Sequence, residues 1–87
     1  MLDRYAIMRM ARSKTRDGWS KRPHRMDVHS AESGAEALAL YALQLPSCWT
    51  VLETVPAKRG LPAWMTARCQ NGAASHETEF AAWRLER

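Results

Sequence analysis

The sequence predicts an α+β fold, in which a small antiparallel sheet of about four strands packs on one central helix and a short helix lies at the C-terminal end. One helix is delimited at both ends near the middle of the chain, and strand-like segments lie on either side of it. The chain has 87 residues, 46% hydrophobic and 25% charged, without a repeat or a linker. This composition is typical of a single globular domain, which we expect to span residues 1–87.

The central helix is expected between Ser30 and Pro46. Ser33 and Glu36 have the spacing of a capping box, in which each side chain accepts a hydrogen bond from a free backbone N–H at the helix start. Pro46 cannot continue a helix and therefore marks its end. The smooth stripe that would face the sheet is predicted to consist of Ala35, Ala39 and Ala42.

Two strands are expected before this helix. Residues 4–12 alternate with a period of two, although Met, Ala and Arg also favour a helix, which stays open as an alternative. Residues 13–23 are expected to form a turn-rich loop, because they contain Asp17-Gly18 and Pro23. Residues 24–30 then alternate again, which predicts Met26 and Val28 on the inner face and His29 on the polar face.

The C-terminal half is predicted to begin with a hairpin, whose strands are residues 49–55 and 63–70. Residues 75–87 fit two structures. Glutamates near the start of this segment and arginines near its end suit a helix dipole, and we favour a helix for that reason. A strand would instead align Ala81, Trp83 and Leu85 on one face.

No apolar run approaches the roughly 20 residues that a membrane-spanning helix needs, and the N-terminal residues do not resemble a secretory signal. We therefore expect a cytoplasmic protein, in the host cytoplasm if a phage encodes it. In that compartment Cys48 and Cys69 are expected to be reduced, buried thiols, with a disulfide or a shared metal as the alternatives. We expect no cofactor.

The net charge of +4 is unevenly distributed, because residues 1–30 hold eight basic and three acidic residues, a net charge of +5. The basic residues of this part interleave with a tryptophan, a pattern that suits a phosphate backbone and a stacked base. A solvated loop is the alternative. The candidate binding residues of this basic arm are Arg12, Lys14, Arg16, Trp19, Lys21, Arg22 and Arg25.

Four tryptophans provide further candidates for a binding surface. Trp49 and Trp83 are predicted to lie in the core, whereas Trp19 and Trp64 are predicted to be exposed. Exposed tryptophans and basic residues are enriched at binding hot spots. Trp64 and the loop residues Lys58 and Arg59 therefore join the basic arm as expected contacts.

Catalytic and metal-binding patterns are weak. Cys48 and Cys69 are not part of the short paired spacings that zinc sites use. His24, His29 and His76 do not lie in a recognisable nucleophile context. We therefore expect neither an enzyme nor a metalloprotein, and we rank a histidine-dependent nuclease third among the functions considered.

The C-terminal third resembles the tail of the small Lar-type restriction-alleviation proteins of phages and prophages. The resemblance is carried by residues 64–73 (WMTARCQNGA), by 79–83 (EFAAW) and by Arg87. That family has a strand ending in Cys-x2-Cys-Gly, followed by an acidic helix with Ala-x2-Trp-x-Arg character. Here Cys69 is followed closely by Gly72, but the second cysteine of the motif and the opening cysteine pair are missing, so the metal site of the family is incomplete.

The resemblance implies a phage or mobile-element setting, which also includes anti-CRISPR proteins. We therefore expect a non-enzymatic binding protein, a monomer or homodimer, that inhibits a host protein or ribonucleoprotein complex by occupying a surface. A small DNA- or RNA-binding accessory protein is the alternative, and no membrane partner is expected.

Overall fold

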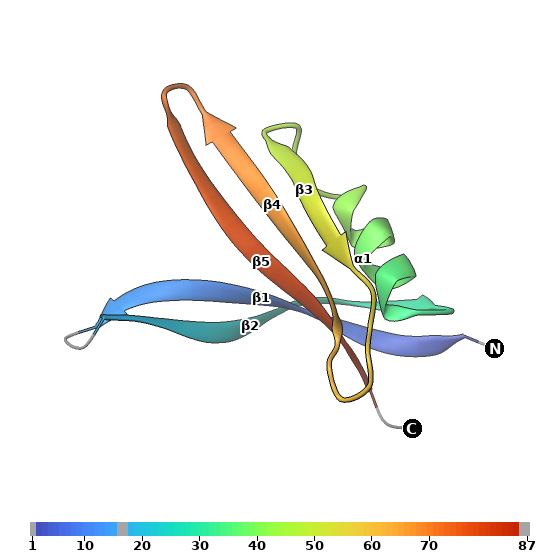
Figure 1. The fold of residues 1–87 in the computed structure, drawn as a ribbon. Coiled ribbons are helices and arrows are strands. Elements are labelled where there is room, and N and C mark those ends of the chain that lie inside the picture. Colours follow the sequence, from blue (N-terminus) through green and yellow to red (C-terminus); the bar gives the residue numbers. More distant parts are fainter. Residues whose placement is uncertain (1, 16–17, 86–87) are drawn as a thin grey trace.

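The computed structural model describes residues 2–15 and 18–85, with side chains for residues 2–10 and 24–85. It shows an α+β fold with five strands and one helix (Figure 1). The elements are β1 (Asp3–Thr15), β2 (Gly18–Ala31), α1 (Gly34–Ala42), β3 (Trp49–Val55), β4 (Ala63–Asn71) and β5 (Ala74–Arg84). All neighbouring strands are antiparallel, and their order in the sheet is β2-β1-β5-β4-β3.

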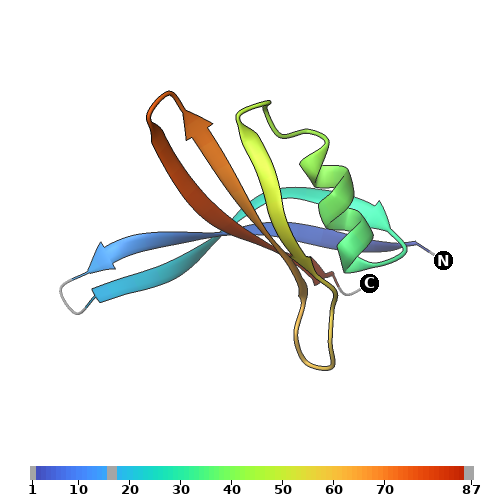
Figure 2. The ribbon, with the colours of Figure 1, turned by 45° about the horizontal axis from the view of Figure 1, so that its top comes forward.

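The first hairpin extends beyond the sheet. β1 pairs with β2 from Asp3 to Thr15, but it pairs with β5 only from Tyr5 to Met10. The remainder of β1 and the facing part of β2 therefore form a two-stranded ribbon that projects away from the other strands (Figures 1 and 2). The predicted loop at residues 13–23 is wrong, because strand pairing continues to Thr15 and resumes at Gly18.

The helix α1 covers one face of the sheet. The Ser33 side chain accepts a hydrogen bond from the Glu36 backbone N–H at 3.1 Å, as the capping motif predicts. Gly34 allows the helix to approach the sheet closely, because a Cβ atom there would lie 3.1 Å from the Ala63 Cβ. The predicted alanine stripe is confirmed in part, because Ala35 and Ala42 pack against the core, whereas Ala39 is exposed. The buried residues of the helix are Gly34, Ala37, Leu38 and Tyr41.

The predicted C-terminal helix is wrong, because residues 74–84 form β5. This strand lies at the centre of the sheet and pairs with both β1 and β4. Gly72, with φ of 61°, provides the tight turn that brings β5 back along β4. Two flanking strands satisfy the backbone of the segment and bury Phe80 and Ala82, which outweighs the charge pattern that favoured a helix. The acidic helix implied by the family resemblance is therefore also absent from the described residues.

The predicted faces of β2 are inverted at Val28 and His29, whereas Met26 lies on the helix side, as predicted. The pairing register shifts between Ile7 and Met8, so that Asp27 pairs with Ile7 while Arg25 pairs with Met8. Met26 lies at this irregularity and is exposed, whereas His29 faces α1 and contacts Tyr41. An extra residue in one strand changes which side chains face the core.

Within the part of the chain that the structure describes, no helix is long and apolar enough to cross a membrane.

Two leucines of α1 provide a matched test of this packing. Leu38 is 0% exposed in the core, whereas Leu40 is 38% exposed. We expect Leu38→Ala to lower the free energy of unfolding by about 2–5 kcal/mol, because it removes buried methyl groups and leaves a cavity. Leu40→Ala should cost less than about 1 kcal/mol. Urea denaturation of both variants measures the difference, and equal losses would contradict the observed helix orientation.

Candidate functional site

The face of the sheet opposite α1 has no helix over it in the described residues and carries an apolar groove, which we call the outer groove. Phe80 and Ala82 of β5 face the helix, so Ala81 and Trp83 face the other side. Ala81 pairs with Trp64 on β4 and with Met8 on β1, and its small side chain leaves room between larger neighbours. The groove has a volume of about 420 Å³. It is lined by Met10, Val55, Pro56, Lys58, Leu61, Pro62, Trp64, Ala81 and Trp83.

Two tryptophans of this groove are exposed to solvent, Trp64 by 44% and Trp83 by 50%. The exposure of Trp64 was predicted from the alternation of β4, which the structure confirms. The prediction that Trp83 lies in the core is wrong. The strand alternative for residues 75–87 places Ala81 and Trp83 on one face, so the information was present in the sequence but was outweighed by the charge pattern.

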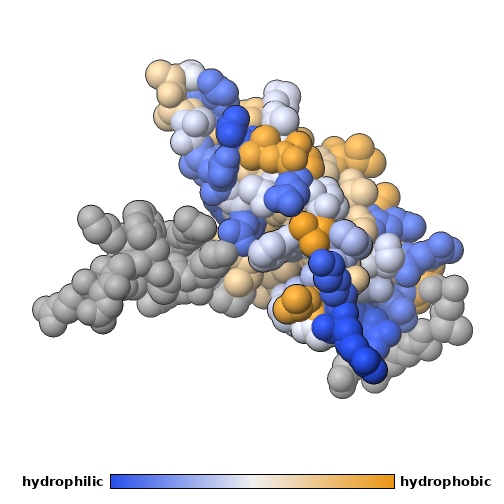
Figure 3. All heavy atoms as spheres, viewed as in Figure 1, coloured by the Kyte–Doolittle hydropathy of each residue, from blue (hydrophilic) through white to orange (hydrophobic). Residues whose placement is uncertain are grey.

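The loop that joins β3 to β4 forms one rim of the groove. Lys58 and Leu61 exchange backbone hydrogen bonds of 3.1 and 2.8 Å, and Gly60 has φ of 79°, so the tip is a defined turn. Lys58 and Arg59 are both exposed on it, as predicted. Figure 3 shows apolar and strongly polar atoms next to each other around this loop. The rim thus combines fixed backbone geometry with positive charge.

The basic arm corresponds to the projecting ribbon. The register places Arg12 opposite Lys21, Lys14 opposite Trp19, and Arg22 opposite Ala11. The side chains of these residues lie outside the described part, and Arg16 lies outside it altogether. Arg25 is described and exposed near the base of the ribbon. The structure therefore brings the predicted basic positions of β1 and β2 next to each other along one hairpin.

A second pocket, of about 300 Å³, lies on the helix side at the base of the ribbon. We call it the helix-side pocket. It contains Arg9, whose guanidinium carbon lies 5.9 Å from the centre of the Trp49 ring. The Arg9 Nε is buried and has no hydrogen-bond partner among the described residues. The lining residues are Arg9, Met26, Tyr41, Gln44, Leu45, Pro46, Trp49 and Phe80.

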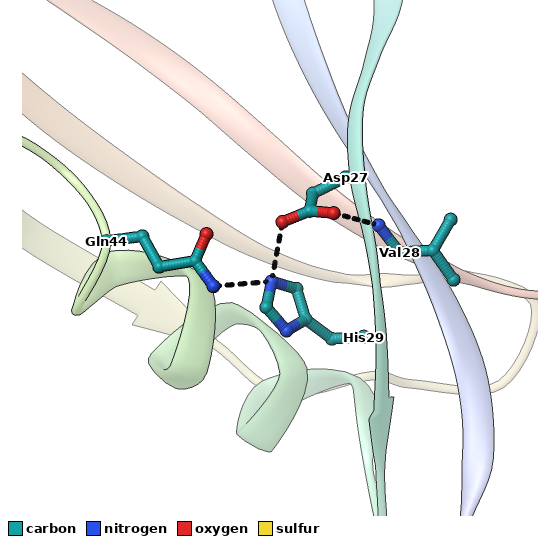
Figure 4. Close-up of polar contacts among 4 residues, drawn as sticks. All are labelled: Asp27, Val28, His29 and Gln44. Atoms are coloured by element: carbon teal, nitrogen blue, oxygen red, sulfur yellow. Dashed lines mark hydrogen bonds and ion pairs between the residues drawn. The ribbon is translucent and has the colours of Figure 1, made fainter.

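A small polar cluster links β2 to the end of α1 beside this pocket (Figure 4). The His29 Nε2 lies 3.1 Å from an Asp27 carboxylate oxygen and 3.4 Å from the Gln44 Nε2. A carboxylate only accepts, so a proton on Nε2 is donated to Asp27, and Gln44 is the secondary contact. The other Asp27 oxygen accepts a hydrogen bond from the Val28 backbone N–H at 2.8 Å. The cluster fixes the orientation of the His29 ring.

The three histidines that would serve a nuclease have different environments. His24 is exposed on β2, and His76 is exposed on β5 with its ring 5.5 Å from the Trp49 ring. His29 is half-buried in the polar cluster described above. Within the described residues, no three His, Cys, Asp or Glu side chains are grouped so that they could hold a metal ion.

Comparison with known proteins finds no match among protein-family models, curated proteins or solved structures.

Tyr41, which lines the helix-side pocket, makes the free energy of unfolding of the protein depend on pH. Burial raises its pKa above the ordinary value, the Asp27 carboxylate raises it further, and Arg9 opposes both. Above about pH 10 the unfolded chain therefore releases this proton more readily than the folded chain, and the free energy of unfolding falls. We expect Tyr41→Phe to reduce this fall, as measured by urea denaturation between about pH 8 and pH 11. Parallel curves for the variant and the wild type would contradict the assignment.

Proposed function

We propose that this protein is a small, non-enzymatic binding protein that inhibits a host defence complex by occupying one of its surfaces. The target would be a CRISPR or restriction complex, and the protein would come from a phage or another mobile element. The observation that carries the proposal is the outer groove, with its two exposed tryptophans. The comparisons provide no independent support for the setting, which depends on the partial family resemblance.

The outer groove has the chemistry of a protein-binding hot spot. Trp64 and Trp83 present large rigid rings, and Ala81, which lies on β5 with Trp83 and pairs with Trp64, leaves a hollow that a partner side chain can fill. Lys58 at the rim adds a positive charge beside the apolar surface. An apolar centre with a charged rim is the usual composition of a protein interface.

The groove also rests on rigid elements. Trp64 lies on β4 and Trp83 lies on β5, and these strands pair along nine residue pairs from Ala63–Ala82 to Asn71–Ala74. A surface that is already ordered loses little conformational entropy when a partner binds. This favours a binding function over a lid or a mobile arm for this face of the molecule.

Inhibition assays with purified CRISPR effector and restriction complexes test the proposal. We expect the wild type to block DNA binding or cleavage by one of them, and Trp64→Ala and Trp83→Ala each to weaken the inhibition about tenfold or more. Leu43→Ala is the matched control, because Leu43 is a large exposed apolar residue at the end of α1, away from the groove. Equal losses for all three variants, or no inhibited complex, would overturn the proposal.

Nucleic-acid binding is the second candidate, and the shape of the ribbon favours it. A two-stranded β-ribbon fits the major groove of DNA, and basic residues along it would neutralise phosphates. The pairing of β1 with β2 places Arg12, Lys14, Lys21 and Arg22 within one such ribbon. Arg25 adds an exposed charge at its base.

The dependence of binding on salt distinguishes this candidate from the first. If the ribbon binds nucleic acid, the affinity should fall steeply as the salt concentration rises. Replacing Arg12, Lys14, Lys21 and Arg22 by Gln should then reduce the magnitude of the slope of log binding constant against log salt concentration by about 3–4. Fluorescence anisotropy with labelled DNA and RNA measures both effects. Trp83→Ala serves as the control, which should leave the slope unchanged. A nucleic-acid affinity that the four substitutions do not alter would exclude the ribbon as the contact.

A further inference from the structure

We propose that Cys48 and Cys69 form a redox modification site, a dithiol that a low-molecular-weight disulfide converts into an intramolecular disulfide bond. The inference does not depend on the proposed function. It rests on the contact between the two thiols and on the backbone that holds them together.

The two sulfur atoms are in direct contact. The Cys69 thiol donates a hydrogen bond to the Cys48 Sγ, with 3.1 Å between the sulfur atoms, and both cysteines are free thiols. Cys69 lies on β4 opposite Trp49, the residue that follows Cys48. The Gln70 backbone N–H also donates to the Cys48 carbonyl at 3.0 Å. The strand ladder thus holds the two backbones next to each other, with the sulfur atoms already in contact.

The two thiols differ in access. Cys48 is half-buried in the turn before β3, whereas Cys69 is buried on the helix side of β4. The hydrogen bond to Cys48 raises the pKa of the Cys69 thiol, burial and the neighbouring Cys48 raise it further, and Arg9 opposes them. A small disulfide therefore reaches Cys48 first, and Cys69 acts as the resolving thiol.

The reaction is balanced with glutathione disulfide as the oxidant. The Cys48 thiolate attacks one sulfur of glutathione disulfide, which forms a mixed disulfide and releases one glutathione thiolate. Cys69 then loses its proton to solvent and attacks the Cys48 sulfur, which releases the second glutathione. The protein loses two electrons and two protons, and one glutathione disulfide becomes two glutathione molecules.

The new bond would stabilise the open edge of the sheet. Among the described strands, β3 is an edge strand that pairs with β4 alone, and the closed loop from Cys48 to Cys69 would include β3 and the loop that carries Lys58. A crosslink across a loop of this size reduces the freedom of the unfolded chain. We expect oxidation to raise the Tm by about 10 °C.

Mass spectrometry with glutathione disulfide tests the proposal. The wild type should lose two hydrogen atoms without forming dimers, and a thiol reductant should reverse this change. Cys69→Ser should accumulate one glutathione on Cys48, because the resolving thiol is missing. Cys48→Ser should react much more slowly, since its remaining thiol is buried.

Any of the following outcomes would overturn the proposal. A stable glutathione adduct on the wild type would show that Cys69 does not reach Cys48, and a crosslinked dimer would show that the thiols react between molecules. Absence of any reaction would show that the pair is a buried structural contact. Thermal unfolding of the wild type before and after oxidation gives a second measurement that needs no substitution, and an unchanged Tm would contradict the stabilisation of the β3 edge.

Discussion

The structure depends on one packing constraint, the burial of β5 beneath α1 at the centre of the sheet. Phe80 is 1% exposed, and its ring lies 5.4 Å from Tyr41 on the helix and 6.0 Å from Trp49 on the edge strand. One side chain therefore joins the central strand β5, the helix α1 and the edge strand β3. A helix of nine residues covers only one face of a five-stranded sheet, and alternation along β5 then places Ala81 and Trp83 on the uncovered face. The outer groove follows from the same constraint as the core.

The sequence predicted the α+β class, the helix cap at Ser33, the hairpin of β3 and β4, and the exposure of Trp64, because these depend on local patterns. The prediction failed at β5 and β2, because the structure of these segments depends on pairing with distant parts of the chain. Charges near the ends of residues 75–87 favour a helix by at most about 1 kcal/mol each, whereas a central strand gains two ladders of hydrogen bonds and a buried face. The faces of β2 depend on a register shift opposite β1 that no local pattern reveals.

The candidate site was predicted in part, because only some of its residues lie in segments whose structure depends on local patterns. Lys58, Arg59 and Trp64 lie in segments with clear turn or strand patterns, and the structure places all three on the surface. Trp83 was missed because its exposure depends on β5. The basic residues of the arm were identified from composition, but their arrangement as a ribbon was not, because strand pairing from Thr15 and Gly18 outweighs the turn-forming residues nearby. Charge is evident in a sequence, whereas the surface on which it is displayed is a property of the fold.

Arg9 shows why the base of the ribbon differs from an ordinary core. Its Nε is buried without a hydrogen-bond partner in the described part of the chain, and such a donor costs about 1–3 kcal/mol. The contact with the Trp49 ring offsets part of this cost, but an aromatic ring is a much weaker acceptor than an oxygen atom. Arg9 lies on β1 where the sheet continues into the ribbon, so the same strand carries a half-buried arginine with an unpartnered Nε and basic residues beyond it. A carboxylate or phosphate oxygen that accepted a hydrogen bond from this Nε would remove the cost.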